Sequence, residues 1–303
     1  MHTVVRRSKR RSLVLTSYYS EGGQGIIYEV PGEPHLLAKL YKTSASHLKS
    51  KLECMVKCPP HLVTSKGHAS IAWPVDILES RSGEALGFLM PKVSGMRVLI
   101  DIYTPRTRKR ICPGFDYKYL HHTAYNLAAV FRSLHAKGYV VGDVKEANVL
   151  VSDSALVTVV DTDSFQVCSG PTVYPCPVAT PEYTPPEAYL KNSSHAKLLS
   201  SHDLFGLAVL IYSLLMEGVH PFAGVFKGSG EPPEIAERIR HGYFAHAPGS
   251  PIRPSDLSLP FKVLDPQIQA LFLRCFVQGH SNPQARPTAM EWQNTIGKAI
   301  KNL

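Results

Sequence analysis

Residues 139–163 have the sequence YVVGDVKEANVLVSDSALVTVVDTD, and the rest of the chain can be interpreted from them. Within this stretch, two apolar runs rich in β-branched residues, at 149–151 and 156–160, flank a short polar turn at 152–154. Strand-forming residues bounded by turn-forming residues are the pattern of a β-hairpin. The two ends of a hairpin lie side by side, so we expect the polar residues just before it and just after it to come together.

Four polar side chains flank this predicted hairpin: Asp143, Lys145 and Asn148 precede it, and Asp161 follows it. Carboxylate and amide oxygens are hard ligands that suit Mg²⁺, and a carboxylate can also orient an attacking hydroxyl group. Asp143 precedes Asn148 by five residues, and Asp161 follows Asn148 by thirteen. The pattern indicates a site for a metal-bound nucleotide.

The composition is that of an ordinary soluble globular protein, with 44% hydrophobic and 19% charged residues in a chain of 303. The longest apolar run, at 205–215, is interrupted by Tyr212 and Ser213 and is too short to span a bilayer. The N-terminus lacks the apolar core of a signal peptide. Six cysteines without paired spacing indicate reduced thiols. We therefore expect a cytoplasmic protein that does not associate with membranes.

The net charge of +9 is partly concentrated in two basic clusters, at residues 6–11 and 106–110. Such clusters can attract nucleic acid or acidic protein surfaces. A solvated tail and a solvated loop are the favoured interpretation, and nucleic-acid binding remains the less favoured alternative.

A glycine-rich segment, SEGGQGIIYEV at 20–30, lies between two predicted strands. Its glycines, Gly22, Gly23 and Gly25, would let the backbone approach phosphates closely and point amide groups at them. The residues after Gly25 are strand-like, whereas the glycines of the dinucleotide-binding fingerprint open a helix. A plain hairpin turn is the alternative interpretation.

Lys39 is embedded in an apolar strand predicted at 36–41. An unpaired charge buried in such a strand is costly, so the lysine needs an acidic partner. The next segment, 47–57, has apolar residues at helical spacing, and Glu53 is its only carboxylate. Glu53 is therefore the expected partner of Lys39, with a solvated Glu53 as the alternative.

Taken in order along the chain, these motifs resemble those of protein kinases. Asp143 and Asn148 match the catalytic loop, and Asp161 matches the metal-binding aspartate that follows it. The resemblance extends from about residue 13 to about residue 300. It pairs Glu187 of the segment PEYTPPE with Arg286 of ARPT, and it places Asp203, at the start of an apolar helix, against the catalytic-loop backbone.

The resemblance implies an α+β, bilobal protein-kinase-like fold, with a small β-rich N-lobe carrying one helix and a larger, mainly helical C-lobe. We expect a basic N-terminal tail at 1–12, an N-lobe with the hinge at 13–94 and a C-lobe at 95–303. An amphipathic helix is predicted at 117–137. More narrowly, the motifs resemble a bacterial group of serine/threonine-kinase-like proteins, which often carry a C-terminal helix-hairpin-helix module or are encoded beside a phosphatase and a von Willebrand-type protein.

The resemblance also assigns roles. Asp143 would orient the substrate hydroxyl, Lys145 would neutralise charge on the transferring phosphoryl group, and Asn148 with Asp161 would hold Mg²⁺ or Mn²⁺. Met90 would occupy the gatekeeper position, and the backbone of Lys92 or Val93 would bind the adenine. The residues expected around ATP are Gly22, Gly23, Gly25, Ile27, Ala38, Lys39, Glu53, Met90, Lys92 and Val93.

The chain departs from the kinase pattern in two places. Val141 and Gly142 replace the His and Arg that usually precede the catalytic aspartate, so activation through a phosphorylated loop is not expected. Thr162 and Asp163 replace the Phe and Gly that usually follow the metal-binding aspartate. Asp163 would serve either as an additional metal-facing carboxylate or in a structural hydrogen bond.

The favoured function is that of a serine/threonine protein kinase that uses MgATP, acts on a protein substrate and also phosphorylates itself. A pseudokinase that binds nucleotide as a regulatory module is the first alternative. A small-molecule phosphotransferase is the second. A cognate phosphatase is a further expected partner.

Overall fold

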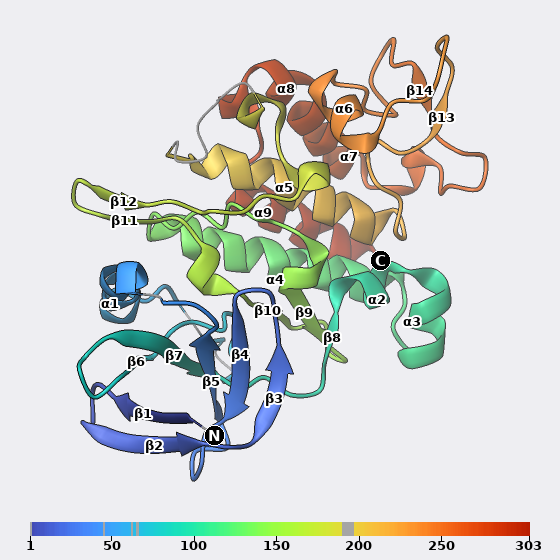
Figure 1. The fold of residues 1–303 in the computed structure, drawn as a ribbon. Helices are drawn as coiled ribbons and strands as arrows, with labels where there is room; N and C mark the ends of the chain where they lie inside the picture. The colour runs from blue at the N-terminus through green and yellow to red at the C-terminus, as the bar shows by residue number, and fades with distance from the viewer. Residues whose placement is uncertain (1, 45, 62, 65–66, 190–196) are drawn as a thin grey trace. The chain divides into compact units, whose positions relative to one another are not determined.

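The computed structural model describes residues 2–44, 46–61, 63–64, 67–189 and 197–303. The chain divides into two compact units. One consists of residues 1–94 with 158–163 and 167–174, and the other of residues 95–157 with 164–166 and 175–303. Each unit is described by itself below, and the chain is α+β as predicted (Figure 1).

The first unit is built on a seven-stranded antiparallel sheet in the order β2-β1-β6-β7-β5-β4-β3. Among the residues of this unit that the structure describes, one α-helix, α1 (Lys49–Lys57), follows β5 and is preceded by a 3₁₀ turn, Ser46–Leu48. The strands are β1 (His2–Arg6), β2 (Arg11–Leu15), β3 (Tyr18–Glu21), β4 (Gly25–Glu29), β5 (Leu36–Tyr41), β6 (Asp76–Glu79) and β7 (Ala85–Pro91). A two-stranded ribbon of β11 (Val167–Ser169) and β12 (Thr172–Tyr174) belongs to the same unit.

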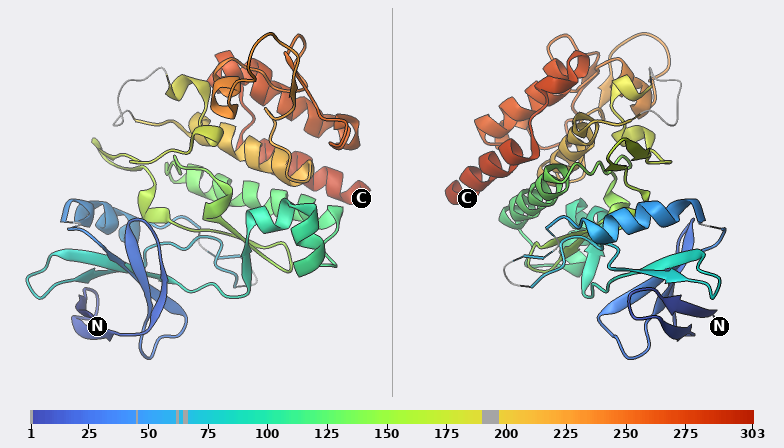
Figure 2. Two further views of the ribbon diagram at one scale, coloured as in Figure 1. Left: turned by 45° about the vertical axis from the view of Figure 1, so that its right-hand side comes forward. Right: turned by 90° about the vertical axis from the view of Figure 1, so that its left-hand side faces the viewer.

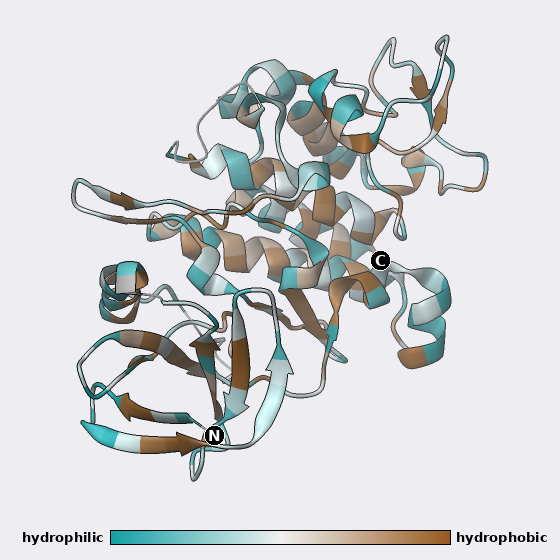
Figure 3. Ribbon diagram, viewed as in Figure 1, coloured by the Kyte–Doolittle hydropathy of each residue, from teal (hydrophilic) through white to brown (hydrophobic). Residues whose placement is uncertain are grey.

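The N-terminal segment is not the solvated tail that its charges suggested. Residues 2–6 and 11–15 form the hairpin β1–β2, and β1 also pairs with β6. Strand β2 changes from hydrophilic at its start to hydrophobic at its end (Figure 3), and Val4, Leu13 and Leu15 are buried in the core of the sheet. The prediction failed because a few apolar residues anchor the hairpin although basic residues surround them.

The second unit is mainly helical. Its central helix, α5, is buried along its whole length, because its apolar residues occupy every face. Helix α4 packs against both α5 and α9, and Figure 2 shows α4 in green beside α9 in red. The helices are α2 (Leu99–Tyr103), α3 (Pro105–Ile111), α4 (Tyr117–Ala136), α5 (Ser200–Leu215), α6 (Ile235–Arg240), α7 (Pro266–Leu273), α8 (Gly279–Ser281) and α9 (Ala289–Ala299).

Short strands and 3₁₀ turns complete this unit. The predicted hairpin is confirmed: β9 and β10 are joined by a tight turn in which the Ser152 amide donates to the carbonyl of Leu156 (2.9 Å). The strands of this unit are β8 (Met96–Val98), β9 (Val149–Ser152), β13 (Val225–Phe226) and β14 (Ile252–Arg253), and β10 (Val157–Val159) begins in this unit and ends in the first. A π-helical stretch, Arg274–Gln278, continues α7.

The second basic cluster is not a solvated loop either. It forms helix α3, where the buried Arg108 donates to the carbonyl of Ile102 and pairs with Glu217. Within the ranges that the structure describes, no helix is both long enough and apolar enough to cross a membrane.

Candidate active site

Lys39 lies in the middle of β5, between Ile27 of β4 and Phe88 of β7. Its ammonium group donates to two carboxylates of the same unit, to Asp161 Oδ1 at 2.8 Å and to Asp163 Oδ1 at 2.7 Å. Burial alone would lower the pKa of Lys39, but the two carboxylates outweigh it and raise the pKa above its usual value. Lys39 is therefore a charged group in a buried strand at neutral pH.

Asp163 is the more buried of the two carboxylates, with 1% of its side chain exposed against 37% for Asp161. The ammonium group of Lys51, from α1, donates to the Asp163 carbonyl at 2.6 Å. The Thr162 hydroxyl donates to the carbonyl of Ala72 at 2.9 Å. These two bonds fix the backbone at Asp163 from both sides.

The hydroxyl of Tyr41, at the end of β5, is also buried near Asp163. Burial, followed by the negative charge of Asp163, raises the pKa of Tyr41 well above its usual value. Both this hydroxyl and Asp163 Oδ2 are buried, and the hydroxyl interacts with the Asp163 carboxylate.

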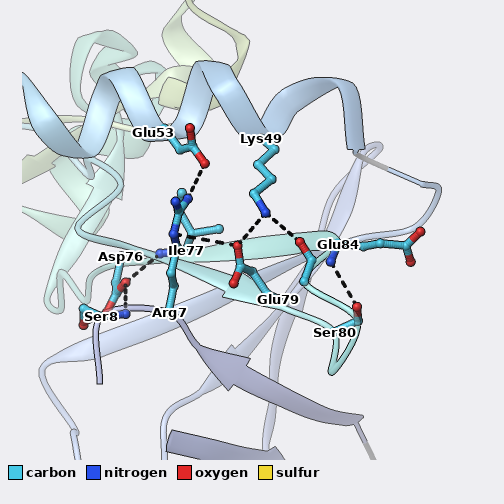
Figure 4. A network of polar contacts seen from close by, with 10 residues as sticks. Arg7, Ser8, Lys49, Glu53, Asp76, Ile77, Glu79, Ser80 and Glu84 are labelled. Atoms are coloured by element: carbon cyan, nitrogen blue, oxygen red, sulfur yellow. Dashed lines mark hydrogen bonds and ion pairs between the residues drawn. The ribbon is translucent and has the colours of Figure 1, made fainter. Parts of the chain in front are cut away.

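Glu53 does not have the partner predicted for it. Its carboxylate pairs with Arg7, which follows the end of β1, and Arg7 also lies near Glu79 of β6 (Figure 4). The expected ion pair between Glu53 and Lys39 is therefore wrong for this structure. A role of Glu53 in binding nucleotide stays a prediction.

The glycine-rich segment is the turn between β3 and β4, closed by a hydrogen bond from the Gly22 amide to the Gly25 carbonyl (2.9 Å). A Cβ atom at Gly25 would lie 2.6 Å from the Leu40 carbonyl oxygen, so close packing on β5 requires a glycine there. Cβ atoms at Gly22 and Gly23 would meet nothing within 4 Å. These two glycines therefore leave the turn open for a ligand to approach, and binding of phosphates there stays a prediction.

The hinge segment begins at the end of β7. Met90 is buried, and the Lys92 amide already donates to the carbonyl of His35 (2.8 Å). The Lys92 side chain pairs with Glu29 and lies over the ring of Tyr19. Of the two amides predicted to meet the adenine, that of Val93 is the better candidate, because that of Lys92 is engaged.

In the second unit, Asp143 is almost completely buried, and each of its carboxylate oxygens has a partner. Lys145 donates to Oδ2 at 2.5 Å, and the Thr180 hydroxyl donates to Oδ1 at 2.7 Å. The Asn148 amide nitrogen donates to the Asp143 carbonyl at 3.2 Å. The three polar residues predicted at the start of the hairpin are thus together. Thr180 was not among the predicted site residues, because the sequence around it does not distinguish it from any other threonine in a loop.

The backbone that carries Asp143 is held by Asp203, at the start of α5. The carboxylate of Asp203 accepts from the Val141 and Gly142 amides, at 2.8 and 2.9 Å, so the predicted bracing is confirmed. Gly142 has a φ of 76°, and a Cβ atom there would lie 2.6 Å from the Cβ of Cys176. The usual arginine cannot be accommodated at this position in this packing.

The protein kinase domain family model matches residues 75–295, which is more than half of the chain. The chain belongs to the protein kinase domain family. It is 33% identical over 278 residues to protein kinase YegI of Escherichia coli O157:H7 and 32% identical over 289 residues to protein kinase YegI of Escherichia coli K12. These alignments cover 90% and 93% of this chain but 42% and 44% of the relatives, so the chain spans less than half of their length.

A more distant relative is the probable cAMP-dependent protein kinase catalytic subunit of Encephalitozoon cuniculi, 29% identical over 140 residues. That alignment covers 46% of this chain and 39% of the relative. The predicted resemblance to a bacterial protein-kinase-like group is confirmed by the two relatives from Escherichia coli.

The kinase family implies ATP and a divalent metal ion, and the donor atoms present suit such an ion. Asn148 uses its amide nitrogen to bind its own loop, which leaves its oxygen as the group that can bind a cation. Asp161 supplies a partly exposed carboxylate at a φ of 57°, a left-handed conformation that aspartate tolerates better than most residues. Both are hard oxygen donors of the kind that Mg²⁺ prefers.

Proposed function

We propose that this kinase domain transfers the γ-phosphoryl group of ATP, with Mg²⁺ or Mn²⁺, to serine and threonine hydroxyls of a protein substrate and of the chain itself. The observation that carries the proposal is the bond from the Thr180 hydroxyl to Asp143 Oδ1, at 2.7 Å. An aliphatic hydroxyl there donates to the carboxylate that would orient a substrate hydroxyl. Asp143 is thus placed to accept a hydrogen bond from serine or threonine.

Lys145 supports this assignment. Its ammonium group binds the other oxygen of Asp143 at 2.5 Å, so a positive charge lies beside the point where an acceptor hydroxyl would be held. In the proposed reaction Asp143 orients the hydroxyl and receives its proton, while Lys145 offsets charge on the transferring phosphoryl group. Lys39 would hold the α- and β-phosphates, and Asn148 with Asp161 would hold the metal ion, which would supply positive charge to offset that of the phosphates.

Radiolabel transfer from γ-labelled ATP to the chain itself and to a basic protein such as histone tests the proposal. We expect Mg²⁺- or Mn²⁺-dependent incorporation on serine and threonine, and a loss of at least about 100-fold in Asp143→Asn. Asp153→Asn is the matched control, because Asp153 is an exposed carboxylate of the β9–β10 turn with 71% of its side chain accessible. Incorporation that survives in Asp143→Asn, or that appears only on tyrosine, would contradict the proposal.

A pseudokinase is the second candidate, and one observation favours it: Lys39 is engaged by two carboxylates while Glu53 is bound by Arg7. Thermal stabilisation by ATP that Lys39→Met removes, without any transfer, would identify this function. Phosphorylation of an aminoglycoside but not of protein would instead identify a small-molecule phosphotransferase.

The proposed partners are ATP and a protein substrate, with a cognate phosphatase to reverse the modification. Binding of nucleic acid is a weaker alternative in the structure than it is in the sequence, because Arg6, Arg7 and Arg108 are engaged in ion pairs. All six cysteines are thiols, which supports the proposed cytoplasmic location.

A further inference from the structure

The buried lysine of β5 has its acidic partner on an unexpected element. Lys39 donates to Asp163 at 2.7 Å, and both groups are inaccessible, with 8% and 1% of their side chains exposed. Glu53, the only carboxylate of α1, is paired with Arg7 near the surface instead. The acidic partner of the lysine thus follows β10 in the chain and does not come from the helix (Figure 4 shows Glu53 turned to Arg7).

We infer that Asp163 is the residue that positions Lys39 for the phosphates of ATP, and that Glu53 has no part in this task. The inference rests on the proposed function and deepens it. Asp163 acts through Lys39 and touches no reacting atom, so it is a positioning residue. Its place in the sequence, two residues after Asp161, is the one where kinases usually carry a glycine.

The difference in exposure between the two carboxylates supports this assignment. Asp161 is partly accessible and can be approached by a metal ion, whereas Asp163 is enclosed. If Asp161 held a metal ion, its carboxylate would neutralise Lys39 less, and Asp163 would still accept from the ammonium group. Without Asp163, Lys39 would have only Asp161 as a carboxylate partner. Its ammonium group would then have to leave Asp161 in order to bind the phosphates.

The contacts around Asp163 restrict the movement of its backbone. The ammonium group of Lys51 binds its carbonyl, and the adjacent Thr162 hydroxyl binds Ala72, so the backbone has little freedom. The Tyr41 hydroxyl is buried near its carboxylate. A charge-assisted bond that a long lysine side chain donates to a rigid, buried acceptor fixes that side chain better than a bond to a surface glutamate.

The test compares Asp163→Asn with Glu53→Gln, both of which replace a carboxylate by an amide of the same shape. We expect Asp163→Asn to lower kcat/KM for MgATP by about 100-fold and to weaken the binding of a fluorescent ATP analogue by about 10-fold or more. Asp163→Glu, which restores the charge on a longer side chain, should recover part of both. Glu53→Gln should change each by less than about 3-fold.

The opposite pattern would overturn the inference: a loss of 10-fold or more in Glu53→Gln, or unchanged binding and kcat/KM in folded Asp163→Asn. Glu53 is partly exposed, with 38% of its side chain accessible, and its amide variant should fold, so that arm can overturn the inference even where Asp163→Asn fails to fold. A merely structural role of Asp163 would lower the melting temperature and leave nucleotide affinity unchanged, which also overturns it. If the native chain binds ATP but transfers no phosphate, the proposed kinase activity fails, and the binding comparison still decides the role of Asp163.

Discussion

Arg286 and Glu187 are 99 residues apart in the sequence and are joined by two hydrogen bonds of 2.7 Å, one from each terminal nitrogen of the guanidinium group. Arg286 also donates to the carbonyls of Ser201 and Gly279, and its side chain is completely buried. The pair connects the segment after the catalytic loop to the start of α5 and the turn before α9. It is the pairing that the two motifs predicted.

We expect Arg286→Ala to lower the free energy of unfolding by about 4 kcal/mol, because it leaves a carboxylate and two carbonyls without their donor. Urea denaturation measures this directly. Arg274→Ala is the control: Arg274 forms a partly exposed pair with Glu291, and its loss should cost about 1 kcal/mol or less. Equal losses of unfolding free energy in the two variants would show that the buried pair stabilises the fold no more than the partly exposed pair does.

Asp203 offers a second prediction, on the catalytic loop itself. Its carboxylate accepts from the Val141 and Gly142 amides, and His135 Nε2 lies 2.9 Å from its Oδ2. An amide in its place can accept at only one atom, so Asp203→Asn leaves a buried amide without a partner. We expect a loss of about 2 kcal/mol in stability and a fall in kcat of at least about 10-fold with little change in KM.

The measurement is steady-state transfer together with urea denaturation. Asp116→Asn serves as the control, because Asp116 accepts one bond from the Tyr119 amide at the exposed start of α4. Asparagine is as good as aspartate at such a position, so this variant should keep both its stability and its activity. An unchanged kcat in folded Asp203→Asn would contradict the bracing role.

The N-terminal hairpin gives a third prediction. Arg6 binds Asp76 and Glu33 at 2.7 and 2.6 Å, in a partly buried cluster, whereas the pair of Arg7 with Glu53 is exposed (Figure 4 shows the latter). Hydrogen bonds from Ser8 and Arg6 outweigh the effect of burial and lower the pKa of Asp76. We expect Arg6→Ala to cost about 3 kcal/mol and Arg7→Ala less than about 1 kcal/mol in thermal or urea unfolding.

The catalytic loop and its supports could be predicted because short-range spacing encodes them. Asp143, Lys145 and Asn148 lie within six residues, and the 3₁₀ turn Glu146–Asn148 brings the Asn148 side chain back to the Asp143 carbonyl. The bracing role of Asp203 could be predicted only from the resemblance to the kinase family, because the amides that it accepts from belong to residues 62 and 61 positions earlier in the chain. Local sequence and a family pattern were sufficient here.

The partner of Lys39 could not be predicted in the same way. Lys39 and Asp163 are 124 residues apart, and the sequence offers Glu53 as a nearer carboxylate on a helix of the expected kind. Which carboxylate pairs with Lys39 depends on whether that carboxylate already has another cationic partner. Glu53 has one in Arg7. The sequence predicts a tail around Arg7, because the basic residues of this segment outnumber the few apolar side chains that anchor the strand.

Acid sensitivity of the second unit is the fourth prediction, and it centres on His246. The imidazole stacks on Phe261, with ring centroids 4.1 Å apart, and its Nε2 lies 2.9 Å from the Tyr212 hydroxyl. Burial lowers the pKa of His246 from 6.5 to about 4. Since the unfolded chain binds a proton at higher pH than the folded chain does, unfolding becomes easier as the pH falls.

The stabilising contribution of neutral His246 is therefore complete above pH 6.5 and is lost as the pH falls towards 4, by at most about 3 kcal/mol. Urea denaturation from pH 7.5 to 4 measures the slope. His246→Gln keeps a group that can accept from Tyr212 and does not titrate, so its stability should vary less over this range than that of the native chain. Identical pH profiles for the two proteins would show that His246 is charged in the folded state or that its surroundings do not disfavour the charge.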